Sequence, residues 1–295
     1  MSTDFPVVMK DGVESPWLAL RIQSHLANTV EDIDRNIEYA LGLQYIPLQD
    51  LFGSESGAVS VVGSGPSLKD NWMKLRDFDG DIVACNASFQ FLLDKGIVPK
   101  YMFCFDADPL MLEFMTPRPD VTYLMGSRCP PKAFEMLEGC RIVVWHAGGD
   151  ENIERLLQKH GRQEPMISGG TAAITRAMML VQPFGYEEVH LWGADSSFRE
   201  SDTHIRKSTT VEKRMTVMVA GKPFQCAPWM AQQAEDFKVL APPLRDLYHI
   251  RLIVHGKGLI PHIASLMGFE TDLEKRYQYV FRQAKHKVKT IWKYL

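Results

Sequence analysis

Short apolar segments that alternate with helical segments constrain the fold of this 295-residue chain more than any other feature. Aliphatic, β-branched and aromatic residues concentrate in seven segments that we predict to be strands, at 58–62, 81–85, 101–105, 121–125, 141–145, 189–192 and 251–254. Helical patterns lie between most of them. Strands alternating with helices favour a mostly parallel, doubly wound sheet covered on both faces. We therefore predict an α/β fold of the Rossmann-like type.

The charge and the apolar and cysteine content of the chain bear on its partners and on its location in the cell. The formal net charge is -3 and the sequence pI is about 6.3, so we expect no nucleic-acid partner. No apolar run reaches the roughly 18 residues of a membrane span, and the N-terminus lacks a basic and then apolar signal pattern. The five cysteines are odd in number and show no C-x-x-C spacing. We expect a cytoplasmic chain with buried thiols.

Three regions are predicted from these patterns. Residues 1–55 are expected to be a helical segment on the core, with an apolar stripe from Pro16 to about Leu43. Residues 56–270 form the catalytic domain, which includes a β-hairpin at 216–226 followed by a helix at about 229–240. Residues 271–295 form a basic amphipathic helix that contacts anionic lipid or a polyanionic acceptor, or instead docks on the core.

The segment VSVVGSGPSLKD places a glycine turn directly after a predicted strand. Gly63 and Gly65 allow positive φ and close approach, and Pro66 suits the first turn of a helix. A helix start of this kind offers free N–H groups to phosphate or carboxylate, so we predict a nucleotide contact from Gly63, Ser64, Gly65, Pro66 and Ser67. A plain turn is the alternative. Leu68 stands where a dinucleotide fingerprint has its third glycine.

Polar residues also follow the other predicted strands, where ligands of open parallel sheets bind. Asn86 could read a base or a ribose, although asparagine also favours turns. Asp106 and Asp108 could hold Mg²⁺, and Asp106 and Asp195 could contact a nucleotide. A second glycine-rich helix start would cradle an anion with Ser168, Gly169, Gly170 and Thr171.

The loop SSFRESDTHIRKS supplies the candidate for proton transfer. His204 could accept a proton from a hydroxyl, and the cations that follow it, Arg206 and Lys207, could stabilise a leaving phosphate. The alternative is an ordinary surface histidine. The histidines and cysteines show no metal-binding spacing.

Taken in order, these motifs resemble one family. GSGPSL, CNASFQFLLDKGIVPKYMFCFDADP, SGGTAAITRAMMLVQPFGYEEVHLWGAD, the TH of SDTHIRKS and VMVAGKPFQC are similar to the 6-hydroxymethylpterin diphosphokinase MptE-like proteins, which include the motility accessory factor (Maf) proteins. The resemblance covers roughly residues 36–263. Several of the motifs are also similar to bacterial sialyltransferases that use CMP-sialic acid and have a Rossmann-like fold.

The resemblance implies two chemistries. In the glycosyltransferase branch, a nonulosonic-acid-type sugar would pass from a CMP donor to a glycan or protein hydroxyl, with His204 matching the general base by its position. In the diphosphokinase branch, ATP would transfer pyrophosphate to a pterin-like alcohol, with Asp106 and Asp108 matching a Mg²⁺ motif. We predict the first, with the second as alternative and a non-catalytic nucleotide-binding protein as a third hypothesis.

The sequence departs from both branches. Where the sialyltransferases have tyrosines at the leaving phosphate, this chain has Ser196, Ser197 and Phe198. The resemblance therefore implies that this role passes to Arg199, Arg206 or Lys207, or is absent. Maf proteins are usually longer, with flanking domains that recognise flagellin, which puts flagellin in doubt as the acceptor.

Overall fold

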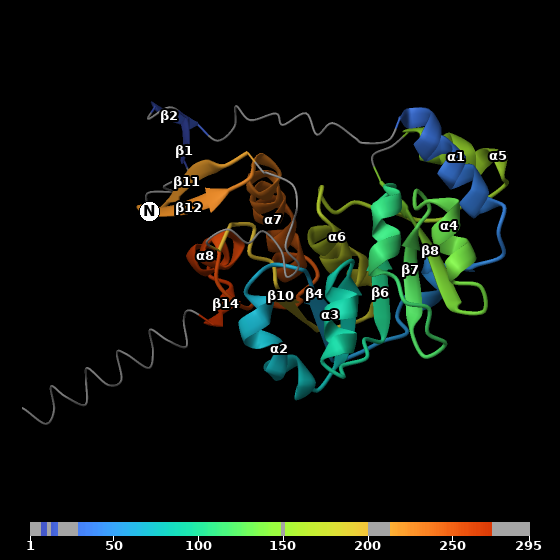
Figure 1. Cartoon of the computed structure of the whole chain (residues 1–295), viewed down its shortest axis with the longest axis horizontal. Helices are drawn as coiled ribbons and strands as arrows, with labels where there is room; N and C mark the ends of the chain where they lie inside the picture. Colours follow the sequence, from blue (N-terminus) through green and yellow to red (C-terminus); the bar gives the residue numbers. More distant parts are fainter. Residues whose placement is uncertain (1–6, 11–12, 17–28, 149–150, 200–212, 273–295) are drawn as a thin grey trace, which may run out of the picture.

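The computed structural model describes residues 7–10, 13–16, 29–148, 151–199 and 213–272. A parallel sheet occupies the centre (Figure 1). Its strand order is β14-β13-β10-β4-β5-β6-β7-β8-β3, and β9 pairs with β8. The strands are β3 (Ile46–Pro47), β4 (Ala58–Val62), β5 (Asp81–Cys85), β6 (Tyr101–Cys104), β7 (Thr122–Gly126), β8 (Arg141–Ala147), β9 (Met166–Ile167), β10 (Glu188–Trp192), β13 (Arg251–Val254) and β14 (Glu270–Thr271).

The strand order reverses at β4. Val59 of β4 pairs with Asp81 of β5 on one side and with Val189 of β10 on the other. From β4, the chain adds β5 to β8 in one direction and later β10, β13 and β14 in the other. In open parallel sheets, ligands bind at the carboxyl ends of the strands beside such a reversal. The topology therefore directs attention to the turns after β4 and β10.

Helices cover both faces of the sheet, as Figure 1 shows. The helices are α1 (Val30–Leu41), α2 (Leu68–Arg76), α3 (Ser88–Asp94), α4 (Pro131–Met136), α5 (Glu151–Lys159), α6 (Ala173–Leu180), α7 (Pro228–Asp246) and α8 (Leu259–Leu266). Short 3₁₀ turns occur at Leu48–Leu51, Pro109–Phe114 and Gln182–Phe184.

Two apolar cores result from the alternation of side chains along each strand. In β4, Val59 and Val61 pack with residues of α1, α5, α6, α7 and α8. Val62 of the same strand faces the other core, which contains residues of α2, α3 and α4. The doubly wound α/β prediction is confirmed, because helices cover the parallel sheet on both sides.

A second, antiparallel sheet has the order β12-β11-β1-β2. Its strands are β1 (Val7–Lys10), β2 (Val13–Pro16), β11 (Met215–Val219) and β12 (Lys222–Cys226). The β11–β12 pair is the predicted inserted hairpin, although its two turn residues are Ala220 and Gly221, both with positive φ. β1 pairs with β11, so the start of the chain and the insertion share one sheet.

The structure corrects the predicted helical N-terminus. Val7–Lys10 and Val13–Pro16 are strands. The helix described in this region begins at Val30, where Thr29 and Asp32 form a capping box. The sequence gives a reason, because Asp-Gly dipeptides favour hairpin turns and the segments before and after Asp11-Gly12 contain the β-branched Val7, Val8 and Val13. The predicted C-terminal helix lies outside the described residues.

The five cysteines carry free thiols, four of them buried and Cys140 partly exposed. None of the described helices combines the length and apolar character needed to cross a membrane.

Candidate functional site

The glycine turn after β4 interlocks with the turn after β10. The N–H of Gly63 donates to Trp192 O at 2.8 Å, and the N–H of Gly65 donates to Gly193 O at 2.9 Å. A Cβ on Gly65 would lie 2.5 Å from Gly193 O, and one on Gly193 would lie 2.5 Å from Gly63 O. These glycines are required because two backbone turns touch.

Asp195 completes this contact from a buried position, with 3% of its surface exposed. Its Oδ2 accepts the Ser67 N–H at 2.6 Å, and its Oδ1 accepts the Ser67 hydroxyl at 2.5 Å. Burial raises the pKa of Asp195 to about 6, against the lowering effect of the Ser67 hydrogen bonds. Asp195 therefore supplies a carboxylate to the start of α2, where a ligand anion was predicted.

The second predicted anion cradle has the same arrangement. Oδ2 of Asp236, on α7, accepts both the N–H and the hydroxyl of Thr171 at 2.7 Å. Gly170 has φ +76°, and a Cβ there would lie 2.7 Å from that same oxygen. The turn before α6 thus also receives its negative charge from the chain, at a residue that the sequence analysis did not single out.

Two adjoining hollows open at this edge of the sheet. The smaller one, of about 140 Å³, is lined by the β4 turn, Asn86 and Ser196, and by residues of α6 and α7. The larger one, of about 400 Å³, is lined by Asn86, Phe105, Asp106, Arg128, Gly170, Thr171, Ala173, Arg176, Trp229, Gln232 and Gln233. Asn86, Ala173, Trp229 and Gln233 border both, so the two hollows form one site.

Asn86 is the shared polar residue of most interest. Its φ is +49°, which is uncommon for a residue other than glycine, and its Oδ1 is buried without a hydrogen-bond partner. The backbone N–H donates to Phe103 O at 3.3 Å and holds the turn after β5. Strain combined with an unpaired buried amide oxygen is typical of a ligand contact.

The acidic pair after β6 separates. Asp106 lines the larger hollow, and its Oδ1 accepts the Asp108 N–H at 3.1 Å. Asp108 caps the following 3₁₀ turn through Leu110 N–H at 2.9 Å and is not among the described residues that line that hollow. In the described part of the chain, no three His, Cys, Asp or Glu side chains gather as a metal site. The two carboxylates of the pair therefore have different surroundings, one at the hollow and one at the start of the 3₁₀ turn.

Of the predicted cations and the predicted base, one residue, Arg199, lies in the described part of the chain. Arg199 forms an exposed ion pair with Asp70 of α2 at 2.6 Å. His204, Arg206 and Lys207 lie outside the described residues.

Sequence reasoning missed two arginines. Arg128 follows β7 and Arg176 lies on α6, and both line the larger hollow. No local sequence motif marks either residue. They lie far apart in the sequence, and only the fold brings them to the same hollow.

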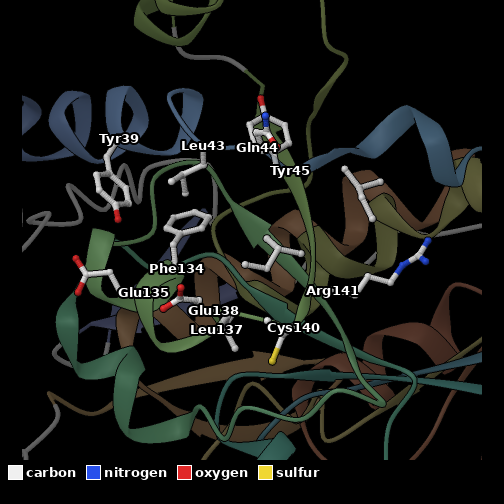
Figure 2. Close-up of a pocket in the computed structure, with 13 residues that line it drawn as sticks. Tyr39, Leu43, Gln44, Tyr45, Phe134, Glu135, Leu137, Glu138, Cys140 and Arg141 are labelled. Atoms are coloured by element: carbon white, nitrogen blue, oxygen red, sulfur yellow. The ribbon is translucent and has the colours of Figure 1, made fainter.

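A third hollow, of about 700 Å³, lies at the opposite, amino-terminal ends of β3 and β8. Figure 2 shows Tyr39, Leu43 and Phe134 there, with Glu135 and Glu138 nearby. None of the predicted site residues lines it. Because the carboxyl ends of the strands and the turns that contain the predicted site residues lie at the other edge, the carboxyl edge is the candidate site.

The fold is similar to that of one solved glycosyltransferase. The Maf glycosyltransferase from Magnetospirillum magneticum AMB-1 aligns with a TM-score of 0.56 and 15% identity, over 78% of this chain and 37% of that chain. This chain therefore matches well under half of the Maf protein's length. Two structures of a mammalian sialyltransferase, one in complex with Gal-beta-1-3GalNAc-ortho-nitrophenol, align with TM-scores of 0.40 and 0.39 at 15% and 12% identity. Both alignments cover 82% of this chain, and they cover 83% and 84% of the two sialyltransferase chains.

No curated protein sequence is significantly similar to the chain. The sequence model of one family, described as 6-hydroxymethylpterin diphosphokinase MptE-like, matches residues 32–201. That span holds the turns after β4, β5, β6, β7 and β10, and with them most of the candidate site. Since it is more than half of the chain, the protein belongs to the MptE-like family.

Proposed function

We propose that the protein is a nucleotide-dependent glycosyltransferase. It moves a nonulosonic-acid-type sugar from a CMP-activated donor to a hydroxyl of a glycan or protein acceptor. Family membership and the fold shared with the Maf glycosyltransferase support a transferase at the carboxyl edge of the sheet. The choice of donor rests on the chemistry of that edge.

The choice of a CMP donor rests on two carboxylates of the chain that lie at helix starts. Asp195 and Asp236 already place carboxylates at the starts of α2 and α6. A chain of three phosphates would meet two negative charges where such ligands usually find free N–H groups. A CMP donor brings a single phosphate, which places less negative charge beside these two carboxylates.

Asn86 then recognises the uncharged part of the nucleotide. Its amide carries an acceptor and two donors, which suit the edge of a cytosine or the hydroxyls of a ribose. The smaller hollow beside it is bordered by Ser64 and Gly65 of the β4 turn and by Ser196. We assign the nucleoside to this part of the site.

The proposed reaction keeps His204 as general base. The acceptor hydroxyl attacks the anomeric carbon of the donor and forms the new C–O bond, while the bond from that carbon to the CMP phosphate oxygen breaks. The hydroxyl proton passes to His204, and CMP leaves with the electron pair of the broken bond. Arg206 and Lys207 stabilise the leaving phosphate, and Arg199 would join them only by leaving Asp70.

A thermal-shift screen tests the donor class. The purified protein is mixed with CMP, CDP, UMP, AMP or ATP, each with and without Mg²⁺. A ligand that binds the folded state raises Tm by an amount set by its concentration relative to Kd. We expect CMP to raise Tm without metal. Stabilisation by ATP or AMP alone, and only with Mg²⁺, would overturn the proposal.

Two substitutions at Asn86 sharpen this test. Asn86→Gly removes the amide and retains the positive φ, and Asn86→Asp keeps the shape but exchanges the amide donors for charge. We expect both to weaken CMP binding at least tenfold while Asn86→Gly keeps Tm within a few degrees of the wild type. Unchanged CMP affinity in both variants would remove Asn86 from the site.

His204→Ala separates an enzyme from a nucleotide-binding protein without activity. We expect this variant to bind CMP normally and to lose at least a hundredfold in transfer rate, in line with loss of a general base. Full transfer by the variant would contradict the role of His204. Absence of transfer by the wild type with any CMP-sugar would favour the non-catalytic alternative.

One observation favours diphosphokinase as the second candidate. Asp106 lines the larger hollow together with Arg128 and Arg176, so the hollow offers a carboxylate and two cations to a polyphosphate. A chelator distinguishes the two, since it should abolish pyrophosphate transfer from ATP and leave sugar transfer from a CMP donor largely intact.

A further inference from the structure

Two arginines converge on one aromatic ring in the larger hollow. The guanidinium carbon of Arg128 lies 5.0 Å from the centroid of Phe105, and that of Arg176 lies 4.6 Å from it. Trp145 stacks on the same ring at 5.3 Å. Burial, together with the charge of Arg128, lowers the pKa of Arg176 to about 10. Phe105 therefore fixes two positive charges near each other.

Within the described residues, no carboxylate forms an ion pair with either guanidinium, although the charge of Asp236 raises the pKa of Arg176 against the larger effect of burial. Arg176 donates to two backbone carbonyls, Ile167 O at 2.7 Å and Gly170 O at 2.6 Å. The Nε atoms of Arg128 and Arg176 are both buried and have no hydrogen-bond partner. Only 9% of the surface of Arg176 is exposed. A buried arginine without a directly paired anion is costly, which points to a charge that arrives with a ligand.

The nearby acids are engaged with other groups. Asp236 accepts from Thr171 and also from Gln232 Nε2 at 3.0 Å. Asp106 is exposed, and one of its oxygens accepts the Asp108 N–H. The hollow thus presents two guanidinium groups, with the side-chain amides of Gln232 and Gln233 as further polar groups in its lining.

We infer that this hollow is an anion subsite, separate from the nucleoside subsite at the β4 turn. It binds an acidic group of the substrate, a carboxylate or a phosphate, between Arg128 and Arg176. The inference rests on the proposed function, because it assigns the second part of the same site. A carboxylate would come from an acidic sugar, and a phosphate would come from a polyphosphate donor. Guanidinium groups bind both through paired N–H donors.

Arg128 is the better residue to change, because no hydrogen bond of its side chain is seen among the described residues, whereas Arg176 holds two carbonyls. Arg128→Gln removes the charge, and Arg128→Lys keeps it without the fork. Arg118→Gln is the matched control, since Arg118 pairs with exposed Asp120 ahead of β7, at the opposite edge of the sheet.

Binding is measured by calorimetry at constant ionic strength with four probes: CMP, N-acetylneuraminic acid, its methyl ester and inorganic pyrophosphate. We expect the wild type to bind at least one anion, and Arg128→Gln to weaken that binding at least tenfold with CMP affinity changed less than threefold. Arg118→Gln should match the wild type. Binding of the acid but not of its uncharged ester identifies a carboxylate, and binding of pyrophosphate alone identifies a phosphate.

The inference is overturned if neither anion binds the wild type, if Arg128→Gln binds the anion unchanged, or if it loses CMP and anion equally. These results differ from failure of the proposed function, in which no CMP binds although the anion does. Unfolding curves of each variant check that the protein used for binding is folded. Recovery of part of the anion affinity in Arg128→Lys would support a charge contact over a change of shape.

Discussion

Glycine at the carboxyl edge is required by the protein's own backbone. Gly193 has φ +61°, and Gly63 O occupies the space a side chain would need. Gly96 has a similar φ of +74° but open space around it. The two positions therefore separate the energy of an unfavourable φ from that of a backbone clash.

Alanine substitutions at these two positions test the interlocked turns. Gly96→Ala should cost about 1 kcal/mol of unfolding free energy, the cost of a left-handed alanine. Gly193→Ala should cost at least about 3 kcal/mol, because the clash adds to that conformational cost. Urea unfolding measures both. Equal costs would mean that the turns after β4 and β10 can move apart freely.

Asp195 should make stability depend on pH. Its folded pKa of about 6 lies above the unfolded value of 3.8, so the folded state binds this proton more tightly. Its contribution is then fully present below about pH 4 and is lost as pH rises through 6. Relative to Asp195→Asn, the wild type should lose on the order of 1–3 kcal/mol between pH 4 and 7. A difference that stays constant with pH would contradict this.

At the residue scale, the sequence predicted where the special turns lie but not what they contact. Gly63 and Gly65 form a turn after a strand, as expected. Their close neighbour is Gly193, which no local pattern could reveal, because it comes from a strand far along the chain. Arg128 and Arg176 escaped notice for the same reason.

At the scale of elements, α7 links several parts of the site. It carries Trp229, Gln232 and Gln233 into the hollows and Asp236 to the start of α6. We predicted a helix over about 229–240, but α7 runs from Pro228 to Asp246 and includes Pro242 and Pro243. Prolines within a pattern usually end a helix, so tertiary packing of Ala241 and Leu244 outweighs the local signal.

Removal of the Asp236 carboxylate should loosen α6 at its start. Asp236→Ala leaves the Thr171 N–H and hydroxyl without their acceptor, which we expect to cost about 1–3 kcal/mol in unfolding free energy. Asp246→Ala is the control on the same helix, because Asp246 only pairs with its neighbour Arg245 in solvent. Guanidinium unfolding compares them, and equal stability of the two variants would show that the α6 turn does not need Asp236.

At the scale of the whole molecule, the sequence predicted seven strands of the central sheet but neither the short β3, β9 and β14 nor the order of the strands. The seven predicted segments are strands, with ends within two residues of those expected. The pairing of β4 with β10 depends on contacts between distant segments, as does the pairing of β1 with β11. Periodicity describes the faces of a strand, and it carries no information about which strand lies beside it.

Amide hydrogen exchange should distinguish the strands at the centre of the large sheet from the strands at sheet edges. β4 and β10 are buried and paired on both sides, whereas β14 has two residues at the sheet edge and β12 lies at the edge of the small sheet. We expect the slowest amide exchange in β4, β5 and β10 and much faster exchange in β12 and β14. Equal protection in β12 and β4 would indicate that both sheets open as one unit.

The late arrival of β10 also matters while the protein is being made. Ser67 and Asp195 are 128 positions apart, so the turn after β4 stays incomplete until most of the chain has left the ribosome. During that interval β5 to β8 can assemble on one side of β4, while its other edge remains an open template for strands of other molecules. Synthesis therefore passes through a stage in which the future centre of the sheet is an exposed edge, and aggregation is favoured there until β10 has been made.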